Sequence, residues 1–324
     1  MTSESQPLVS VITPVYNGEE YLSECIESVL AQSYDNWEYC IVNNCSTDRT
    51  LEIAESYAKK HKQIRIHNNS EFVSMAQNAN NAFRQISLSS KYCKVIHADD
   101  WLFPECLTRM VEVAEAHPTV AIVGAYGLVG DRVKWDGLPY PSTVISGRDI
   151  CRWTLLGRTY VFGNPTCLLL RSDVVRASDP FYDESNIHRD SEACFKILRG
   201  WDFGFVHQVL TYLRVREGSQ TGYSKRYNTY LPNSIDRLLK FGPAVLSQDE
   251  LNVRLNGSLA GYYSYLAESV FRLREKEFWS YHRAKMRDMG YPLSLPRLFT
   301  AVCEKTLDYV LNPKQTMERI WRKS

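Results

Sequence analysis

The order of short apolar runs and amphipathic stretches is the feature that most limits what this chain can fold into. Apolar runs of strand length recur from Leu8 to Val123, and stretches with helical periodicity separate them. Such alternation requires crossover connections, so it predicts an α/β protein with a mostly parallel central sheet flanked by helices. The expected strands are Leu8–Thr13, Tyr39–Val42, Ile64–Ile66, Tyr92–Ile96 and Val120–Val123, and the expected helices are Glu19–Ser33, Thr47–His61, Val73–Gln85 and one that begins near Pro104.

The pattern changes in the last third of the chain. After a less regular region with one expected helix over Arg148–Leu156 and strands over Thr166–Leu170, Phe203–Val206 and Val209–Leu213, the sequence becomes helical. We therefore expect an α/β domain over residues 1–220 and a helical C-terminal extension over residues 221–324.

Composition excludes some classes of protein. A formal net charge of +1 gives no general attraction for nucleic acid, so we expect no nucleic-acid partner. Nine cysteines without a CxxC pair are typical of reduced thiols in the cytoplasm. No apolar run approaches the ~20 residues that span a bilayer, and the N-terminus lacks a leader pattern, so the expected location is cytoplasmic.

Polar clusters follow three of the expected strands. They are Thr13–Asn17, Asn43–Asn44 and Asp99–Asp100. Ligands of open parallel sheets bind outside the carboxyl ends of the strands. One polar cluster could arise by chance, but three on the same edge predict a single binding site.

The stretch HADDWLFP places two carboxylates, Asp99 and Asp100, directly after an apolar strand. Carboxylate oxygens suit a divalent cation, and such a cation can bind a diphosphate. The alternative is an acidic turn at the beginning of the helix near Pro104, where negative charge is also favourable.

Several segments together resemble glycosyltransferase family 2, whose members are inverting nucleotide-sugar transferases with the GT-A fold. VSVITPVYNGEEYLSECIESVLAQSY is similar to the first strand, loop and helix of that family, and IVNNCSTDRT to its second strand and turn. HADD stands in the place of its metal-binding DxD motif. FYDES and HRDSEACFKILRGW resemble the segments around its catalytic acid. The resemblance covers residues 7–220.

The resemblance implies a nucleotide-binding role for the first polar clusters. Tyr16 would stack on the base, Thr13 and Pro14 would shape the loop, and the Asn44 amide would bond the base edge. The alternatives are a half-buried loop tyrosine and an asparagine pair that only makes the turn. Asn78 also matches a family position.

The acidic pair would serve the ribose and a metal ion. Asp99 would contact the nucleotide, and Asp99 and Asp100 would hold Mg²⁺ or Mn²⁺. His97 stands where the family has an aspartate, and a satisfied, partly buried histidine is the alternative to a ligand role.

The resemblance assigns the general base to Asp190, at the start of an expected helix. An aspartate at a helix start is otherwise a cap, and Glu192 is a rival base. Candidate phosphate contacts are His188, Arg189, Arg214 and Arg216. The chain departs from the family pattern at Asn43, Asn44, Gln77 and Arg189, where aspartate, arginine or glutamate is common.

We therefore expect a metal-dependent inverting glycosyltransferase of the hexosyltransferase type, acting in cell-surface polysaccharide or glycan synthesis. It would use a nucleotide-sugar donor, with a UDP-sugar favoured, and a saccharide or lipid-linked acceptor. The alternatives are a non-catalytic nucleotide-sugar-binding or scaffold protein on the same fold, and a sugar nucleotidyltransferase, although TPVYNG lacks the lysine typical of that class.

The C-terminal segment allows two interpretations. Its apolar and basic residues would suit peripheral contact with the inner face of a membrane, and they would equally suit a helix packed on the core with a solvated basic face. These residues are Leu295, Leu298, Val302, Arg297, Lys305, Lys314, Arg319, Arg322 and Lys323.

Overall fold

The computed structural model describes residues 6–215 and 220–312. The chain forms two compact units, Met1–Val215 and Arg216–Ser324, and each is described by itself. The functional division into an active domain over residues 1–220 and an extension over residues 221–324 stays a prediction.

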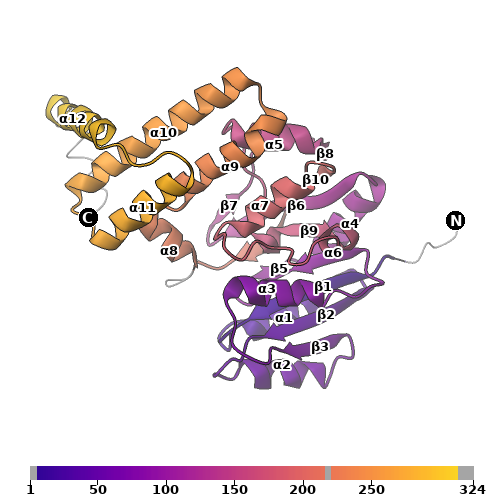
Figure 1. Cartoon of the computed structure of the whole chain (residues 1–324). Coiled ribbons are helices and arrows are strands. Elements are labelled where there is room, and N and C mark those ends of the chain that lie inside the picture. Colours follow the sequence, from indigo (N-terminus) through magenta and orange to yellow (C-terminus); the bar gives the residue numbers. More distant parts are fainter. Residues whose placement is uncertain (1–5, 216–219, 313–324) are drawn as a thin grey trace. The chain divides into compact units, whose positions relative to one another are not determined.

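A ten-stranded sheet is the centre of the first unit (Figure 1). The strands pair in the order β3-β2-β1-β4-β9-β6-β10-β5, with β7 on β6 and β8 on β10. They are β1 (Val9–Val15), β2 (Trp37–Asn43), β3 (Ile64–Asn68), β4 (Tyr92–Val95), β5 (Trp101–Leu102), β6 (Val120–Val129), β7 (Arg132–Lys134), β8 (Val144–Ile145), β9 (Leu168–Arg171) and β10 (Asp202–Leu213).

The predicted fold class is confirmed. Strands β1, β2, β3, β4, β6 and β10 run in one direction, and the shorter strands β5, β7, β8 and β9 run against them. Two expected strands over Phe203–Val206 and Val209–Leu213 are one strand, β10, whose register against β6 shifts between Val206 and Val209.

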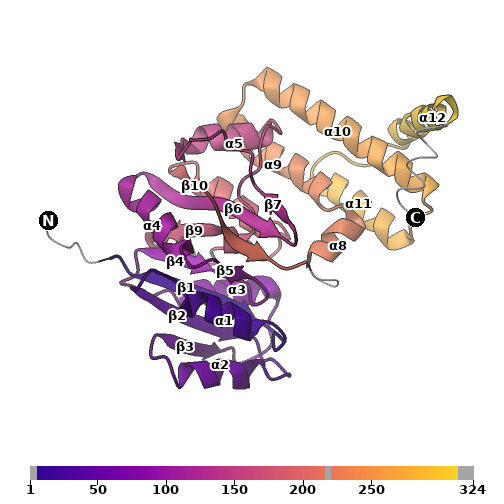
Figure 2. The ribbon, with the colours of Figure 1, turned by 180° about the vertical axis from the view of Figure 1, so that it is seen from behind.

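Helices cover both faces of this sheet. Figure 1 shows α3 in front of β1 and β2, and the reverse view in Figure 2 shows α1 on the opposite face. The helices of the first unit are α1 (Leu22–Leu30), α2 (Thr50–Ala58), α3 (Met75–Arg84), α4 (Cys106–Ala116), α5 (Gly147–Leu155), α6 (Ser172–Arg176) and α7 (Arg189–Ile197), with a 3₁₀ turn, η1 (Pro165–Cys167).

The apolar periodicity of α1 explains how it packs on the sheet. Leu22, Cys25, Ile26 and Val29 share one side of the helix and are buried. They join side chains of β1, β2 and α4 in the main core. This packing fixes the loop between β1 and α1, which carries the first predicted polar cluster.

The second unit is helical. Its helices are α8 (Gln220–Tyr227), α9 (Tyr230–Val245), α10 (Gln248–Phe271), α11 (Lys276–Asp288) and α12 (Leu295–Leu311). A capping box of Ser247 and Glu250 begins α10. In the described ranges, no helix is both long and apolar enough to pass through a lipid bilayer.

The cysteines differ in exposure. Seven are buried, Cys45 is half-buried, and Cys303 on α12 is exposed. Burial raises the pKa of the Cys25 thiol to about 12, because the thiolate is poorly solvated inside the protein.

Candidate functional site

The three predicted polar clusters lie at one edge of the sheet, because β2, β1 and β4 are parallel neighbours. Hydrogen bonds join the loops. The Asn17 side chain accepts from the Thr47 backbone at 2.9 Å, and the Gly18 backbone donates to Thr50 Oγ1 at 2.7 Å. A Cβ on Gly18 would lie 3.5 Å from the Cβ of Ala98, so the loop after β1 also approaches the loop after β4.

Asp100 is held inside the protein on the β4 side of this edge. Its Oδ2 accepts from Thr166 Oγ1 at 2.6 Å and from Asn164 Nδ2 at 3.3 Å. Its Oδ1 accepts from the Arg214 backbone N–H at 3.2 Å. A carboxylate has about four accepting positions, so these donors leave about one for a ligand.

The neighbours of Asp100 differ in their exposure. Asp100 is 4% exposed, whereas Asp99 and His97 are half-buried. Burial raises the pKa of the Asp100 carboxyl, the nearby His97 opposes this rise, and the charge of Asp99 adds to it. His97 Nδ1 lies 3.8 Å from Asp100 Oδ2. Asp99 is thus the more accessible carboxylate of the pair.

Arg214 brings the end of β10 to this acidic pair. Its Nε donates to the Asp99 carbonyl at 3.3 Å, and its Nη2 pairs with Glu24 of α1 at 2.5 Å. The guanidinium lies 4.1 Å from the ring centre of Tyr21 and 5.3 Å from that of Trp101. These contacts place a planar cation beside the acidic pair, where it could also bind a phosphate.

Asn44 uses its amide within the protein. Its Oδ1 accepts from the Val73 backbone at 3.0 Å and from Asn69 Nδ2 at 2.9 Å, and its Nδ2 donates to the Val73 carbonyl at 2.8 Å. The residue is 2% exposed. In this structure the amide holds the loop before α3, so contact with a base would require that loop to move. The base-edge role stays a prediction.

A network of asparagines extends from this point. Asn69 Nδ2 also donates to Asn78 Oδ1 at 2.9 Å, and Asn69 Oδ1 accepts from Asn81 at 3.0 Å. Sequence reasoning chose Asn44 and Asn78 but missed Asn69, which joins them. The only signal was the density of asparagine between residues 68 and 81, which local periodicity does not interpret.

Tyr16 lies at the rim, and its neighbours in the sequence point inward. Tyr16 is 47% exposed and packs edge-on against Phe72, with ring centres 4.8 Å apart. Thr13 is fully buried and bonds Tyr39 at 2.8 Å, so its side chain shapes the strand end from within. Pro14 is half-buried beside it. Phe72, which the sequence did not single out, enlarges the aromatic surface.

Asp190 lies in the first turn of α7, half-buried. It lines a small cavity of about 10 Å³, room for about one water molecule, together with Tyr182, Cys194 and apolar residues of β4 and β9. Pro165 lines the same cavity. The segment around Pro165 therefore lies between Asp190 and Asp100, because Asn164 and Thr166 bond Asp100.

Glu192, the rival base, already bonds other side chains of the protein. It is 6% exposed, pairs with Lys196 at 3.0 Å and accepts a short hydrogen bond from Asn186. This pairing favours Asp190 over Glu192 as the group open to a proton. The role of general base stays a prediction.

The remaining candidates have varied positions. His188 is the N-cap of α7, and Arg189 begins that helix, half-buried. Gln77 caps α3, since its Oε1 accepts from the Ser74 backbone at 3.0 Å. Arg216 lies outside the described residues. Their roles toward phosphate stay predictions.

The residues present fit a cation that is partly held by its substrate. Within residues 6–215 and 220–312, no three His, Cys, Asp or Glu side chains converge on a metal-sized position. Mg²⁺ in phosphate-transfer sites is commonly held by one or two carboxylates plus substrate oxygens and water. Asp99 and Asp100 supply that number of hard oxygen donors.

Comparison with known proteins adds a family. The sequence model described as "Glycosyl transferase family 2" matches residues 10–177, more than half of the chain. The chain is 33% identical over 174 residues to EpsE of Bacillus subtilis (strain 168), provisionally named a glycosyltransferase, a match that covers 49% of this chain and 59% of EpsE.

TuaG of the same organism, provisionally named a teichuronic acid biosynthesis glycosyltransferase, is 32% identical over 134 residues, which are 41% of this chain and 51% of TuaG. The chain thus spans less than two thirds of the length of these curated relatives.

Solved structures share the fold. A crystal structure of residues 1–349 of S. aureus TarS in complex with UDP-GlcNAc has a TM-score of 0.63 at 20% identity, covering 87% of this chain and 80% of that one. The mannosyltransferase PcManGT from Pyrobaculum calidifontis, in complex with GDP-Man and Mn²⁺, has a TM-score of 0.57 at 16% identity, covering 97% and 84%. The predicted GT-A-like fold is confirmed.

Proposed function

We propose that this chain, which belongs to glycosyl transferase family 2, moves one sugar from a nucleoside diphosphate to a hydroxyl of a carbohydrate or lipid-linked acceptor. The reaction is metal-dependent and inverts the anomeric carbon. The observation that carries the proposal is one edge of the sheet. The aromatic pair of Tyr16 and Phe72 and the acidic pair follow β1, β3 and β4 there, and Arg214 at the end of β10 bonds the acidic pair.

The donor is a UDP-sugar in this proposal. The complex of TarS with UDP-GlcNAc supports this choice, and the complex of PcManGT with GDP-Man marks the main competitor. Tyr16 and Phe72 offer the exposed aromatic surface for the base. Thr13, Pro14, Asn44 and Asn78 shape the loops below that surface.

A divalent cation bound with the donor, Mn²⁺ or Mg²⁺, would be held by Asp99 and Asp100 and would stabilise the charge on the leaving diphosphate. Arg214 would add a second positive group. Its present partner, Glu24, is 59% exposed in its side chain, so a diphosphate would compete with a pair that water already weakens.

Asp190 is the general base of the proposal. The acceptor hydroxyl attacks the anomeric carbon, its proton passes to the Asp190 carboxylate, and the bond from that carbon to the diphosphate oxygen breaks. A single displacement forms no covalent intermediate with the protein. Among the described residues, Asp190 makes no hydrogen bond or ion pair that would have to break first.

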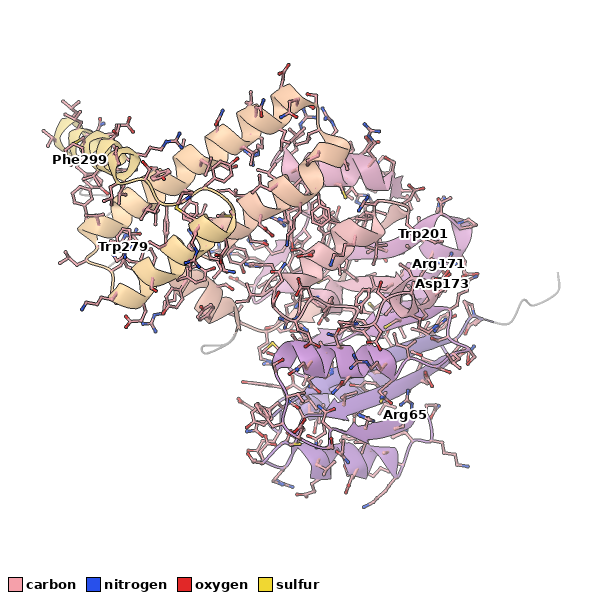
Figure 3. The ribbon with its side chains drawn as sticks, in the orientation of Figure 1. Arg65, Arg171, Asp173, Trp201, Trp279 and Phe299 are labelled. Atoms are coloured by element: carbon pink, nitrogen blue, oxygen red, sulfur yellow. The ribbon has the colours of Figure 1, made fainter. Side chains whose placement is uncertain are left out.

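For a lipid-linked acceptor, the proposal includes contact between helix α12 and a membrane surface. On α12, Leu295, Phe299, Leu307 and Val310 are 59–72% exposed, and Figure 3 labels Phe299 on that helix. Leu298 and Val302 of the same helix are half-buried. Lys314, Arg319, Arg322 and Lys323 lie outside the described residues, and their charge in the sequence favours an anionic lipid surface on the cytoplasmic side. Phe299→Glu should reduce sedimentation with anionic vesicles, and unchanged sedimentation would refute the contact.

A thermal-shift panel with the whole chain tests the proposed function. UDP, UDP-GlcNAc and GDP-mannose are each added with Mn²⁺ and with a chelator. Saturation at a hundred times Kd stabilises the folded state by about 2.7 kcal/mol, which raises the melting temperature by several degrees. We expect the largest shift with a UDP-sugar and Mn²⁺.

Other outcomes would redirect the proposal. The absence of any nucleotide-dependent shift would overturn it. Donor binding without turnover on a broad acceptor panel would favour a non-catalytic binding protein. Release of pyrophosphate from a nucleoside triphosphate would favour a sugar nucleotidyltransferase.

A further inference from the structure

A lysine lies in the middle of the apolar sheet. Lys94 belongs to β4 and is fully buried. Its Nζ donates to the carbonyl of Thr166 at 2.6 Å, to the carbonyl of Leu168 at 3.2 Å and to Met110 Sδ at 3.6 Å. These three acceptors match the three N–H groups of a lysine side chain.

Such a residue is costly to bury. A polar group in an apolar interior destabilises the fold unless its hydrogen bonds are made, and an aliphatic side chain of similar volume would fill the same space without that demand. Lys94 forms no ion pair with any acidic residue in the described part of the chain. Its backbone partners are the carbonyl of Thr166 within η1 and that of Leu168 directly after it, so its specific effect is to fix that turn.

The opposite side of the same turn faces the acidic pair. Thr166 Oγ1 donates to Asp100 at 2.6 Å and accepts from the His97 backbone at 3.2 Å. Asn164 adds a second bond to Asp100, and Pro165 lies beside Asp190 in the small cavity. The segment 164–168 therefore connects Lys94 inside the sheet to Asp100, which it bonds, and to Asp190, which lines the same small cavity.

We propose that Lys94 is a positioning residue, which acts through segment 164–168 to orient the Asp100 carboxylate for a nucleoside diphosphate and its cation. The inference rests on the proposed function, and it deepens that proposal by assigning a role to a residue that touches no ligand. Removal of a group that orients a metal ligand typically weakens metal affinity by about tenfold to a hundredfold.

A double-mutant cycle tests this chain of contacts. Lys94→Met removes the Nζ bonds and keeps the volume. Thr166→Val keeps the carbonyl that Lys94 binds and removes the hydroxyl, which donates to Asp100 and accepts from the His97 backbone. Calorimetry measures the Kd of UDP with Mn²⁺, and of GDP with Mn²⁺ as a second probe. We expect each single variant to weaken binding about tenfold or more, and the double variant to be no weaker than the worse single variant.

The control is Thr211→Val. Thr211 is fully buried and contacts Cys167 of the same turn at 3.3 Å, but none of its hydrogen bonds reaches Asp100. We expect it to lower stability in urea without changing the Kd. A purely structural Lys94 would behave in the same way, so a Lys94→Met protein with normal affinity would overturn the assignment.

Two further outcomes are decisive. Independent, additive losses in the double variant would show that Lys94 does not act through Thr166, and would also overturn the assignment. Where Lys94→Met does not fold, Thr166→Val decides, since normal binding by that variant breaks the link to Asp100. Absence of nucleotide binding by the wild type overturns the proposed function itself, and the Lys94 role with it.

Discussion

The two halves of the binding edge use polar groups in different ways. On the amide side, after β2, Asn44, Asn69 and Asn78 bond to one another and to backbone, and the network carries no net charge. On the acidic side, after β4, Arg214 is the shared partner of three acidic residues. Its backbone N–H donates to the Asp100 carboxylate, and its guanidinium donates to the Asp99 backbone carbonyl and pairs with the Glu24 carboxylate.

This difference indicates that the amide side holds loops in place, whereas the acidic side is suited to binding a cation. Amides that satisfy one another are stable without a ligand, and they hold loops in place. An excess of negative charge beside a half-buried site is a reason to bind a cation, because like charges close together disfavour ionisation. The comparison predicts that substitutions on the acidic side impair turnover, whereas those on the amide side impair folding.

The largest effect is expected for Asp99→Ala. Loss of several kcal/mol of cation-assisted stabilisation should lower turnover by about a thousandfold, measured as nucleoside diphosphate release. Asp99 is half-buried, so the melting temperature should change little. The matched control is Asp173→Ala, which removes a carboxylate paired with Arg171 at 2.8 Å, away from the edge (Figure 3). Full activity of Asp99→Ala would end the assignment of the acidic side.

Asp190→Asn comes next. Loss of a general base should lower kcat by about a hundredfold, while the Kd of the donor stays the same. Glu192→Gln discriminates between the two acids. Because Glu192 is already paired with Lys196, this substitution should lower the free energy of unfolding more than it lowers kcat. The reverse pattern, with turnover lost only in Glu192→Gln, would move the base to Glu192.

Asn44→Ala tests the amide side. It leaves the Val73 backbone N–H and carbonyl without their partners and should lower the free energy of unfolding by about 1–3 kcal/mol, measured in urea. Asn36→Ala, at an exposed site, should have little effect. A stable Asn44→Ala protein with strongly reduced donor binding would contradict the scaffold role and place this amide on the base.

The smallest effect is expected for Tyr16→Ala. Loss of one stacking ring should weaken donor binding by about 1 kcal/mol, or five- to tenfold in Kd, measured by calorimetry. Tyr16→Phe keeps the ring and should bind normally. Equal losses in both variants would assign the contribution to the hydroxyl rather than to stacking.

Much of the fold could be predicted from periodicity, because the signal is local. The expected strand Tyr39–Val42 is the centre of β2, and the expected helix Arg148–Leu156 is α5 shifted by one residue. Strand direction was harder to predict. Nothing near Thr166–Leu170 indicates that β9 inserts between β4 and β6 and runs against both, since this depends on pairing with distant residues.

The site was predictable only as a set of positions. Strand ends indicated where Tyr16, Asn44 and Asp99 would gather. They did not indicate which polar side chains at this edge would be hydrogen-bonded within the protein. The Asn44 bonds reach Asn69 and Val73, and the Asp100 bonds reach Thr166 and Arg214. Such partners are far apart in sequence, so spacing rules cannot supply them.

The uneven exposure of the cysteines allows selective labelling of one helix. In the part of the chain that the structure describes, Cys303 is the one exposed cysteine, and it lies on α12 among the apolar residues that we assign to a lipid surface. A maleimide dye should therefore attach to that helix faster than to the half-buried Cys45, whose thiol donates to the Asn69 carbonyl at 3.4 Å. Its emission would then report how deeply α12 enters a vesicle during donor turnover, without any substitution in the protein.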